Sequence, residues 1–376
     1  MKKISFFLNC AASAMFAIAL TACSATEDNP TGFDPSLKDV TIQSGDTLAP
    51  IVDQMAAYTN DILLEIPAGV DTVYTGDITL DPGKTLAIIG DEKNPPVVMS
   101  TNSILFSSDL LFKDVTISGK ENKNPIIKIN TTSTDVFTID YIVFNNVIVD
   151  SLQAQLFYAN KKKVVVNNFA VENCIIAIKG ATKKTIFDFN GGGLPNHLSV
   201  NNSTIYADDK TTWANGGFYS TQAGSKIDEV NVDSIVISIK NSILYNICKG
   251  FNLSSLRQNS AKTQKYIVTN NVFADCGKFD ANNDQTQAMV GLNNGAAGND
   301  YNWDVDHNVI MRDGQFYTEK KIGKTEGLIK NSVPVNPQYK DAAEGNFRPT
   351  NLIFLNLKNA PGDPRWVDWV NRYKKN

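Results

Sequence analysis

The chain has 376 residues, and its 35 basic and 39 acidic residues give it a net charge of −4 at pH 7. An acidic protein repels the phosphate groups of nucleic acids, so this composition disfavours non-specific nucleic-acid binding. Predicted cleavage of the first 22 residues, which include two lysines, leaves 33 basic against 39 acidic residues, a net charge of −6.

Residues 1–22 have the pattern of a secretory signal peptide, in which the letters MKK precede an apolar run. This run is too short and wrongly flanked for a stable spanning helix. Its last letters, LTAC, match the lipobox of bacterial lipoproteins, and this resemblance implies cleavage before Cys23 and acylation of Cys23. Residues 23–36 would form a lipidated tether, whose Glu27 and Asp28 resemble the export signals of surface lipoproteins. We expect an outer-membrane lipoprotein exposed at the cell surface; the alternative is an ordinary secreted protein.

Residues 48–57 carry Leu48, Ile51, Val52 and Met55 at helical spacing, which predicts a short amphipathic helix. A strand-like segment follows it. Because an open stack of strands exposes its first strands to other chains, we expect this helix to cap that end.

A seven-residue pattern, seen as VTNNVFA at residues 268–274, returns along the rest of the chain. Each copy has alternating apolar residues on both sides of one Asn or Asp, which predicts two short strands joined at a corner. Asn tolerates the left-handed conformation of such a corner and can bond from one coil to the next. The predicted ladder consists of Asp114, Asn146, Asn173, Asn202, Asn241, Asn271, Asn308 and Asn331.

The spacings within this ladder vary from 23 to 39 residues, as coils with loops of variable length would give. The residues directly after it are small, which suits a crowded interior. We therefore predict an all-β parallel solenoid, with residues 37–376 as a single domain because a solenoid grows by adding coils to one core. Unrelated strands of a β-sandwich would not explain the recurring corner residue. Cys174 falls in the interior, and Cys248 and Cys276 are expected to be free thiols rather than a disulfide.

Each coil needs a third strand, and the candidate strands alternate so that one residue of each faces outward. A row that mixes aromatic, charged and amide side chains suits a sugar chain, whose rings stack while its hydroxyls need polar partners. The alternative is that loops cover the aromatic residues. With a loop tryptophan and a loop arginine added, the predicted glycan-binding residues are Lys128, Tyr158, Asp188, Trp213, Phe218, Asn252 and Arg257.

Basic residues in or beside the loops after these strands favour an anionic, pectin-like glycan. β-Elimination of a uronate needs a base, for which Arg257 or Lys262 are candidates, and usually Ca²⁺. Hydrolysis needs two facing carboxylates, and the predicted groove offers only Asp188. We therefore expect a binding protein with no cofactor or metal, with a polysaccharide lyase as the alternative and a structural or adhesive surface protein as the second alternative.

Residues 364–373 place Trp366 and Trp369 at helix-like spacing and predict a short helix that caps the last coil. The segments ILLEIPAG and TLAIIG at residues 62–69 and 85–90 resemble the opening of pectin-lyase-like right-handed β-helices. NPQYKD, GNFR and GDPRW near the end resemble the closing coils of a lipoprotein group of unknown function, found beside glycan-uptake systems of Gram-negative gut bacteria. This resemblance implies a right-handed parallel β-helix and outer-membrane glycan transporter components as partners; such folds host lyases, hydrolases and binders alike.

Overall fold

The computed structural model describes residues 41–179, 185–208, 218–220, 230, 232–247, 252–254, 261–276, 291–292, 300–312, 315–316 and 331–367. At 252–254, 261–264, 291–292, 300–303, 312 and 315 it describes the backbone only. The predicted signal peptide and Cys23 lie outside these residues. Within the described ranges, the helices are too short or too polar to span a lipid bilayer.

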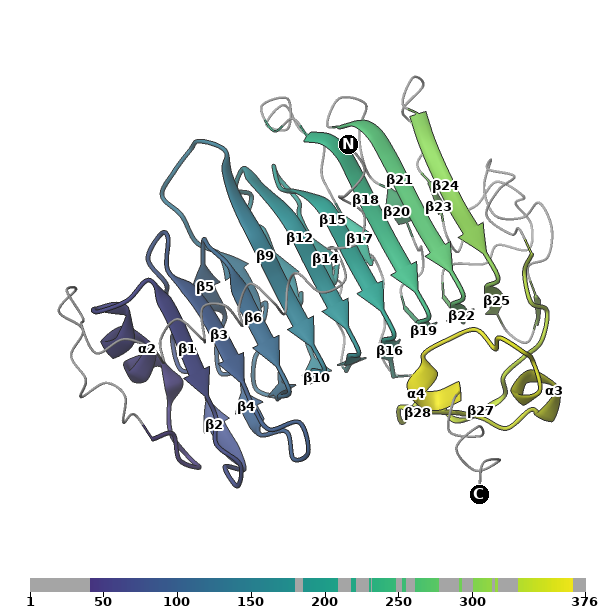
Figure 1. The fold of residues 1–376 in the computed structure, drawn as a ribbon, viewed down its shortest axis with the longest axis horizontal. Coiled ribbons are helices and arrows are strands. Elements are labelled where there is room, and N and C mark those ends of the chain that lie inside the picture. Colours follow the sequence, from purple (N-terminus) through teal and green to yellow (C-terminus); the bar gives the residue numbers. More distant parts are fainter. Residues whose placement is uncertain are drawn as a thin grey trace, which may run out of the picture. The chain divides into compact units, whose positions relative to one another are not determined.

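Three parallel sheets run along the stack of coils and hold most of the described strands (Figure 1). The nine-stranded sheet contains β1 (Asp61–Glu65), β3 (Thr85–Ile89), β6 (Leu110–Lys113), β9 (Phe137–Asn145), β12 (Val164–Glu172), β15 (Leu194–Asn201), β18 (Val232–Lys240), β21 (Ala261–Thr269) and β24 (Asp300–Asp306). The ten-stranded sheet contains β2 (Thr72–Tyr74), β4 (Val97–Met99), β7 (Thr116–Ser118), β10 (Ile148–Leu152), β13 (Ile175–Ile178), β16 (Thr204–Ala207), β19 (Ile243–Tyr245), β22 (Val272–Ala274), β25 (Val309–Arg312) and β26 (Gln315–Phe316). The five-stranded sheet contains β5 (Ile104–Phe106), β8 (Ile127–Ile129), β11 (Phe157–Tyr158), β14 (Phe187–Asp188) and β17 (Tyr219–Ser220).

Strands of successive coils pair in parallel and in register, as β9 does with β12 and β12 with β15. In the third position of later coils, β20 (Asn252–Ser254) pairs with β23 (Gly291–Leu292). Only β25–β26 and the hairpin β27 (Tyr339–Asp341) to β28 (Asn346–Pro349) are antiparallel among the described pairs. The predicted parallel β-helix is confirmed.

Along the strands, every second residue faces the interior, where apolar side chains at equivalent positions of neighbouring coils stack. Phe112 and Phe144 are paired in register, and their ring centroids are 5.0 Å apart at an interplanar angle of 17°. Phe157 meets Phe169 edge to face at 5.3 Å. These four side chains are at most 1% exposed, so the coils share one continuous apolar core.

From β6 onward, the turn between the nine-stranded and ten-stranded sheets carries one left-handed residue per coil, with φ between 47° and 60°, and Asn331 further along the chain has the same conformation. We call these residues the corner column: Asp114, Asn146, Asn173, Asn202, Asn241, Asn270, His307 and Asn331. Amide hydrogen bonds link some members between coils, from Asn146 Nδ2 to Asp114 Oδ1 at 2.7 Å and from Asn270 Nδ2 to Asn241 Oδ1 at 2.8 Å.

The predicted ladder was wrong by one residue in two coils, because Asn270 and His307 occupy the corner instead of Asn271 and Asn308. Strand register pairs Ile239 with Val268 and Val268 with Val305, which moves Asn271 and Asn308 one position inward. They belong to a second, buried set, the inner column: Val115, Val147, Cys174, Ser203, Ser242, Asn271 and Asn308. Because Asn270 and Asn271 are adjacent, the sequence pattern matches either alignment.

The polar members of the inner column satisfy backbone groups of neighbouring coils. Ser203 Oγ accepts from the amide of Cys174 at 3.0 Å, and Asn271 Oδ1 accepts from the amide of Ser242 at 2.9 Å. Asn308 Oδ1 in turn accepts from the amide of Asn271 at 2.9 Å. The interior of the corner therefore changes along the stack from apolar contacts to a chain of hydrogen bonds.

Helix α2 (Leu48–Ala56) packs against β1 and covers the first coil (Figure 1), as predicted. Leu48 and Val52 are buried, and Lys84 Nζ donates to the carbonyls of Ala56 at 2.6 Å and Thr59 at 2.9 Å. Carbonyls at the end of a helix lack partners within the helix, so this lysine stabilises its end.

Lys84→Met should weaken docking of α2 on the first coil by about 1–2 kcal/mol, because it removes two charged hydrogen bonds at the end of the helix. Faster hydrogen exchange of the α2 amides would measure this. Lys93→Met is the matched control, since Lys93 is exposed and its side chain makes none of the hydrogen bonds described. Equal protection of α2 in both variants would contradict this role of Lys84.

Residues 333–367, which we call the C-terminal strap, fold back over the outer face of the ten-stranded sheet (Figure 1). The strap contains β27, β28, α3 (Leu352–Leu355) and α4 (Pro364–Val367). Its Phe347 packs on Tyr206 with ring centroids 5.3 Å apart, and Trp366 Nε1 donates to Thr204 Oγ1 at 2.9 Å. The described part of the predicted C-terminal helix thus covers the side of the stack at β16 rather than its last coil.

Gly362 allows the strap to lie close to the sheet. Its φ is +113°, and a Cβ at this position would lie 3.2 Å from Ile243 Cγ1 and 3.3 Å from Val272 Cγ2. The amide of Gly362 donates to the carbonyl of Asn270 at 2.8 Å. A residue with a side chain would be strained in this conformation and would push the strap outward.

Candidate functional site

The outward face of the five-stranded sheet holds the first three of the predicted glycan-binding residues. Lys128 is paired with Tyr158, and Tyr158 with Asp188, on consecutive coils. Register extends this set, which we call the outer row, to Leu105 at one end and Ser220 at the other. Lys128 and Tyr158 are partly exposed, whereas Asp188, predicted to be available on this face, is buried with an exposed fraction of 9%. The row places a lysine, a tyrosine and an aspartate on successive strands, whose backbones in a sheet lie about 4.8 Å apart.

Three donors fix the Asp188 carboxylate. Ser220 Oγ donates to Oδ1 at 3.0 Å, the amide of Asn190 also donates to Oδ1 at 3.0 Å, and Gln155 Nε2 donates to Oδ2 at 3.2 Å. Partial burial, and secondarily the charge of Asp188, raise the pKa of Tyr158. The phenol therefore stays protonated at neutral pH and can donate a hydrogen bond to a ligand.

Phe218 was predicted to face outward, and this was wrong. Register pairs Tyr219 with Phe187 and Ser220 with Asp188, so Phe218 lies one position before the strand and not on its outer face. Phe218 is fully buried, and its ring meets that of Phe187 edge to face with centroids 5.1 Å apart. The sequence pattern had aligned Ser220 with Asn190, which shifted this coil by two residues.

The remaining predicted residues are placed only in part. Asn252 begins β20 and Lys262 lies in β21 of the nine-stranded sheet, and of both only the backbone is described. Trp213, Arg257 and Cys248 lie outside the described residues. The two alternative catalytic bases, Arg257 and Lys262, therefore stay predictions.

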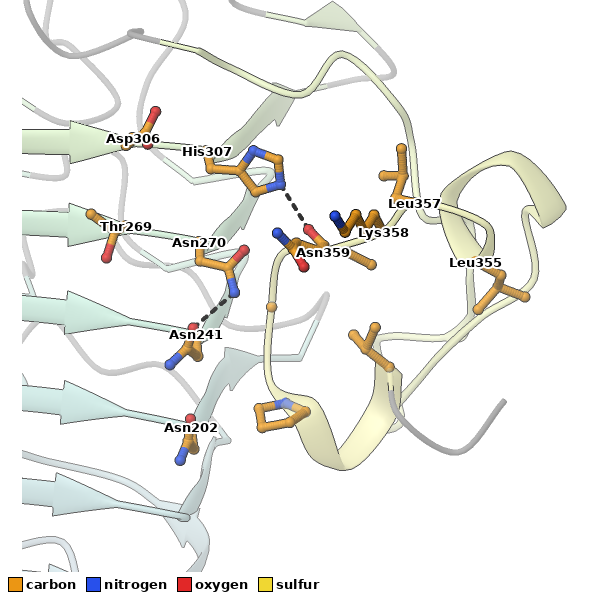
Figure 2. A pocket seen from close by; sticks show the side chains of 14 residues that line it. Asn202, Asn241, Thr269, Asn270, Asp306, His307, Leu355, Leu357, Lys358 and Asn359 are labelled. Carbon is orange, nitrogen blue, oxygen red and sulfur yellow. Dashed lines mark hydrogen bonds between the residues drawn. The ribbon is translucent and has the colours of Figure 1, made fainter. Parts of the chain in front are cut away.

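A pocket that the sequence did not indicate lies between the corner column and the strap (Figure 2). Its cavity volume is about 640 Å³. The corners of four coils and the residues before two of them form one wall: Asn202, Asn241, Thr269, Asn270, Asp306 and His307. The strap forms the other wall with Leu355, Leu357, Ala360, Pro364 and Val367, together with Lys358 and Asn359.

His307 joins the two walls of this pocket. Its Nε2 lies 2.7 Å from the carbonyl oxygen of Asn359, toward which the ring points in Figure 2. Because a carbonyl can only accept, Nε2 must carry the proton, and Nδ1 of a neutral ring is then an acceptor. Asp306 Oδ1 accepts from Asn331 Nδ2 at 2.7 Å, which fixes the orientation of the carboxylate.

Among the described residues, no group of three His, Cys, Asp or Glu side chains lies close enough together to hold a metal ion. Cys174 is buried in the inner column, and burial raises the pKa of its thiol to about 12. The thiol donates to the carbonyl of Glu172 at 3.1 Å and stays protonated at neutral pH.

Comparison with known families identifies one stretch of the chain. Residues 69–208 match the family model of a domain of unknown function, DUF4957. The DUF4957 match includes the outer row from Leu105 to Asp188 and ends after β16. No curated protein and no solved structure matches the chain.

Proposed function

We propose that this protein is a cell-surface lipoprotein that binds a polysaccharide along the outer row of the five-stranded sheet. The observation that carries this proposal is the in-register placement of Lys128, Tyr158 and Asp188 on three consecutive coils. Repetition at the strand spacing lets an extended polymer meet one side chain of the protein after another.

The chemistry of the row suits an anionic, pectin-like glycan. The Lys128 ammonium can pair with a uronate carboxylate, and the Tyr158 ring offers an apolar face on which a sugar ring can stack. The protonated phenol supplies a donor beside this face. The predicted lipid on Cys23 would hold the site at the outer membrane, where glycan transporter components are the proposed partners.

Tyr158→Ala should weaken binding of the polysaccharide at least tenfold, or about 1.4 kcal/mol, because it removes the only aromatic ring of the outer row. Affinity electrophoresis of the full-length chain in gels with pectins, other uronate polymers or neutral glycans measures the change. Tyr74→Ala is the matched control, since Tyr74 is 39% exposed on β2 of a different sheet.

Unchanged retardation of Tyr158→Ala would contradict the proposed site, and no retardation in any gel would favour a structural or adhesive role. Ultraviolet absorbance followed with and without Ca²⁺ tests the lyase alternative, because β-elimination produces an unsaturated sugar. Rising absorbance would make the protein a lyase.

A further inference from the structure

We propose that the pocket between the corner column and the strap is a second binding site, which takes a neutral mono- or disaccharide. Its volume of about 640 Å³ lies within the usual range of about 300–1,000 Å³ for ligand pockets. This pocket is separate from the outer row, because coil corners and the strap form it and the five-stranded sheet does not contribute to it. It is independent of the function proposed above.

The wall formed by the coil corners is rich in hydrogen-bond acceptors. Asp306 contributes a carboxylate that Asn331 holds in place, and the contact of His307 Nε2 with the Asn359 carbonyl orients the imidazole ring. The side chains of Asn202, Asn270 and Thr269 line the same wall. A ligand that matches this wall must supply several hydrogen-bond donors, as the hydroxyl groups of a sugar do.

The facing wall is apolar and fits the C–H face of a sugar ring. Leu355, Leu357, Pro364 and Val367 line it, and all four are only partly exposed. One carboxylate, Asp306, and one ammonium, Lys358, balance each other in charge among the lining residues. This balance favours an uncharged ligand over an anion or a cation, and the combination of a polar and an apolar wall favours a saccharide.

Asp306→Ala should weaken binding of the saccharide at least tenfold, because it removes the main acceptor of the polar wall. Saturation-transfer NMR on the full-length chain, with glucose, galactose, xylose, maltose and cellobiose as probes, measures the affinities. Asp304→Ala is the matched control: Asp304 lies two residues earlier on the same strand, is exposed, and does not line the pocket.

A second pair of variants separates loss of the site from loss of folding. Leu357→Trp fills the pocket and should abolish binding, whereas Leu352→Trp should keep it, because Leu352 is 72% exposed on α3. Tyr158→Ala should leave binding of small saccharides intact, whatever it does to polysaccharide binding. No binding of any probe at millimolar concentration, or equal affinities of Asp306→Ala and Asp304→Ala, would overturn the proposal.

Discussion

Asn271→Ala should lower the free energy of unfolding by about 3–5 kcal/mol, because this one amide satisfies polar groups of the two coils on either side of its own. Its Oδ1 accepts from the amide of Ser242 at 2.9 Å, and its Nδ2 donates to the carbonyl of Ile239 at 2.8 Å and to Asn308 Oδ1 at 3.0 Å. Asn271 is fully buried, so water cannot replace these partners. Urea unfolding measures the loss, and hydrogen exchange at the Ser242 amide locates it.

The neighbouring coils provide the controls for this substitution. Asn271→Ser should recover part of the loss, because Ser242 and Ser203 occupy the same column and their hydroxyls accept from the amides of the coils before them. Asn241→Gly, at the half-buried corner, keeps the left-handed conformation and should cost about 1 kcal/mol or less. An equal cost at Asn271 and Asn241 would contradict a special role for the inner column.

Docking of the strap should strengthen as the pH falls from 7.5 to 4.5, by about 2 kcal/mol relative to Asp363→Asn. Asp363 is 1% exposed, and its burial raises the pKa of the carboxyl from 3.8 to about 6. The nearby Arg365 charge and the hydrogen bond from Thr204 Oγ1, 2.8 Å from Asp363 Oδ2, lower the pKa but do not offset burial.

The sign follows from which state holds the proton more tightly. The docked carboxyl has the higher pKa, so the docked strap binds the proton more tightly than the released strap does. Above about pH 6 the buried carboxylate is charged and weakens docking, and below pH 3.8 this cost is absent. The difference between the pKa of about 6 in the docked strap and 3.8 in the released strap corresponds to about 3 kcal/mol of docking free energy between high and low pH.

Hydrogen exchange of the Gly362 amide, which is bonded to the Asn270 carbonyl, reports release of the strap. Asp363→Asn removes the titratable carboxyl. Protection of the Gly362 amide should therefore depend less on pH in this variant than in the unmodified protein. Asp341→Asn is a suitable control, because Asp341 is an exposed carboxylate on β27 of the same strap. Parallel pH profiles for the protein and Asp363→Asn would refute the titration of Asp363.

The repeat was visible in the sequence because each coil needs a left-handed corner, and Asn or Asp at such a corner is a local requirement. Residues such as Asn146 and Asn173 could therefore be placed without a structure. Asn271 and Asn308 could not, since the adjacent Asn270 and His307 offered a second alignment that only pairing with the neighbouring strand excludes. The short strands of the five-stranded sheet gave still less information, and Phe218 was misplaced for that reason.

The pocket could not be predicted because no local pattern reports where the strap lies. His307 and Asn359 are 52 residues apart, and their contact depends on the path that residues 333–367 take across the sheet. Trp366 and Val367 showed in the sequence only that an apolar segment must be covered. Which face of the stack covers this segment depends on the tertiary structure of the whole fold.

Repeat folds usually gain their stability from contacts between neighbouring coils, and any part of the stack can form first. The strap departs from this rule, because Trp366 bonds to Thr204 across 162 residues of sequence. The strap can dock only on coils that have already assembled, and it is the last of the described segments to be synthesised. Folding of the coils from β16 to β25 thus acquires a final closing step, after which they open together rather than one by one.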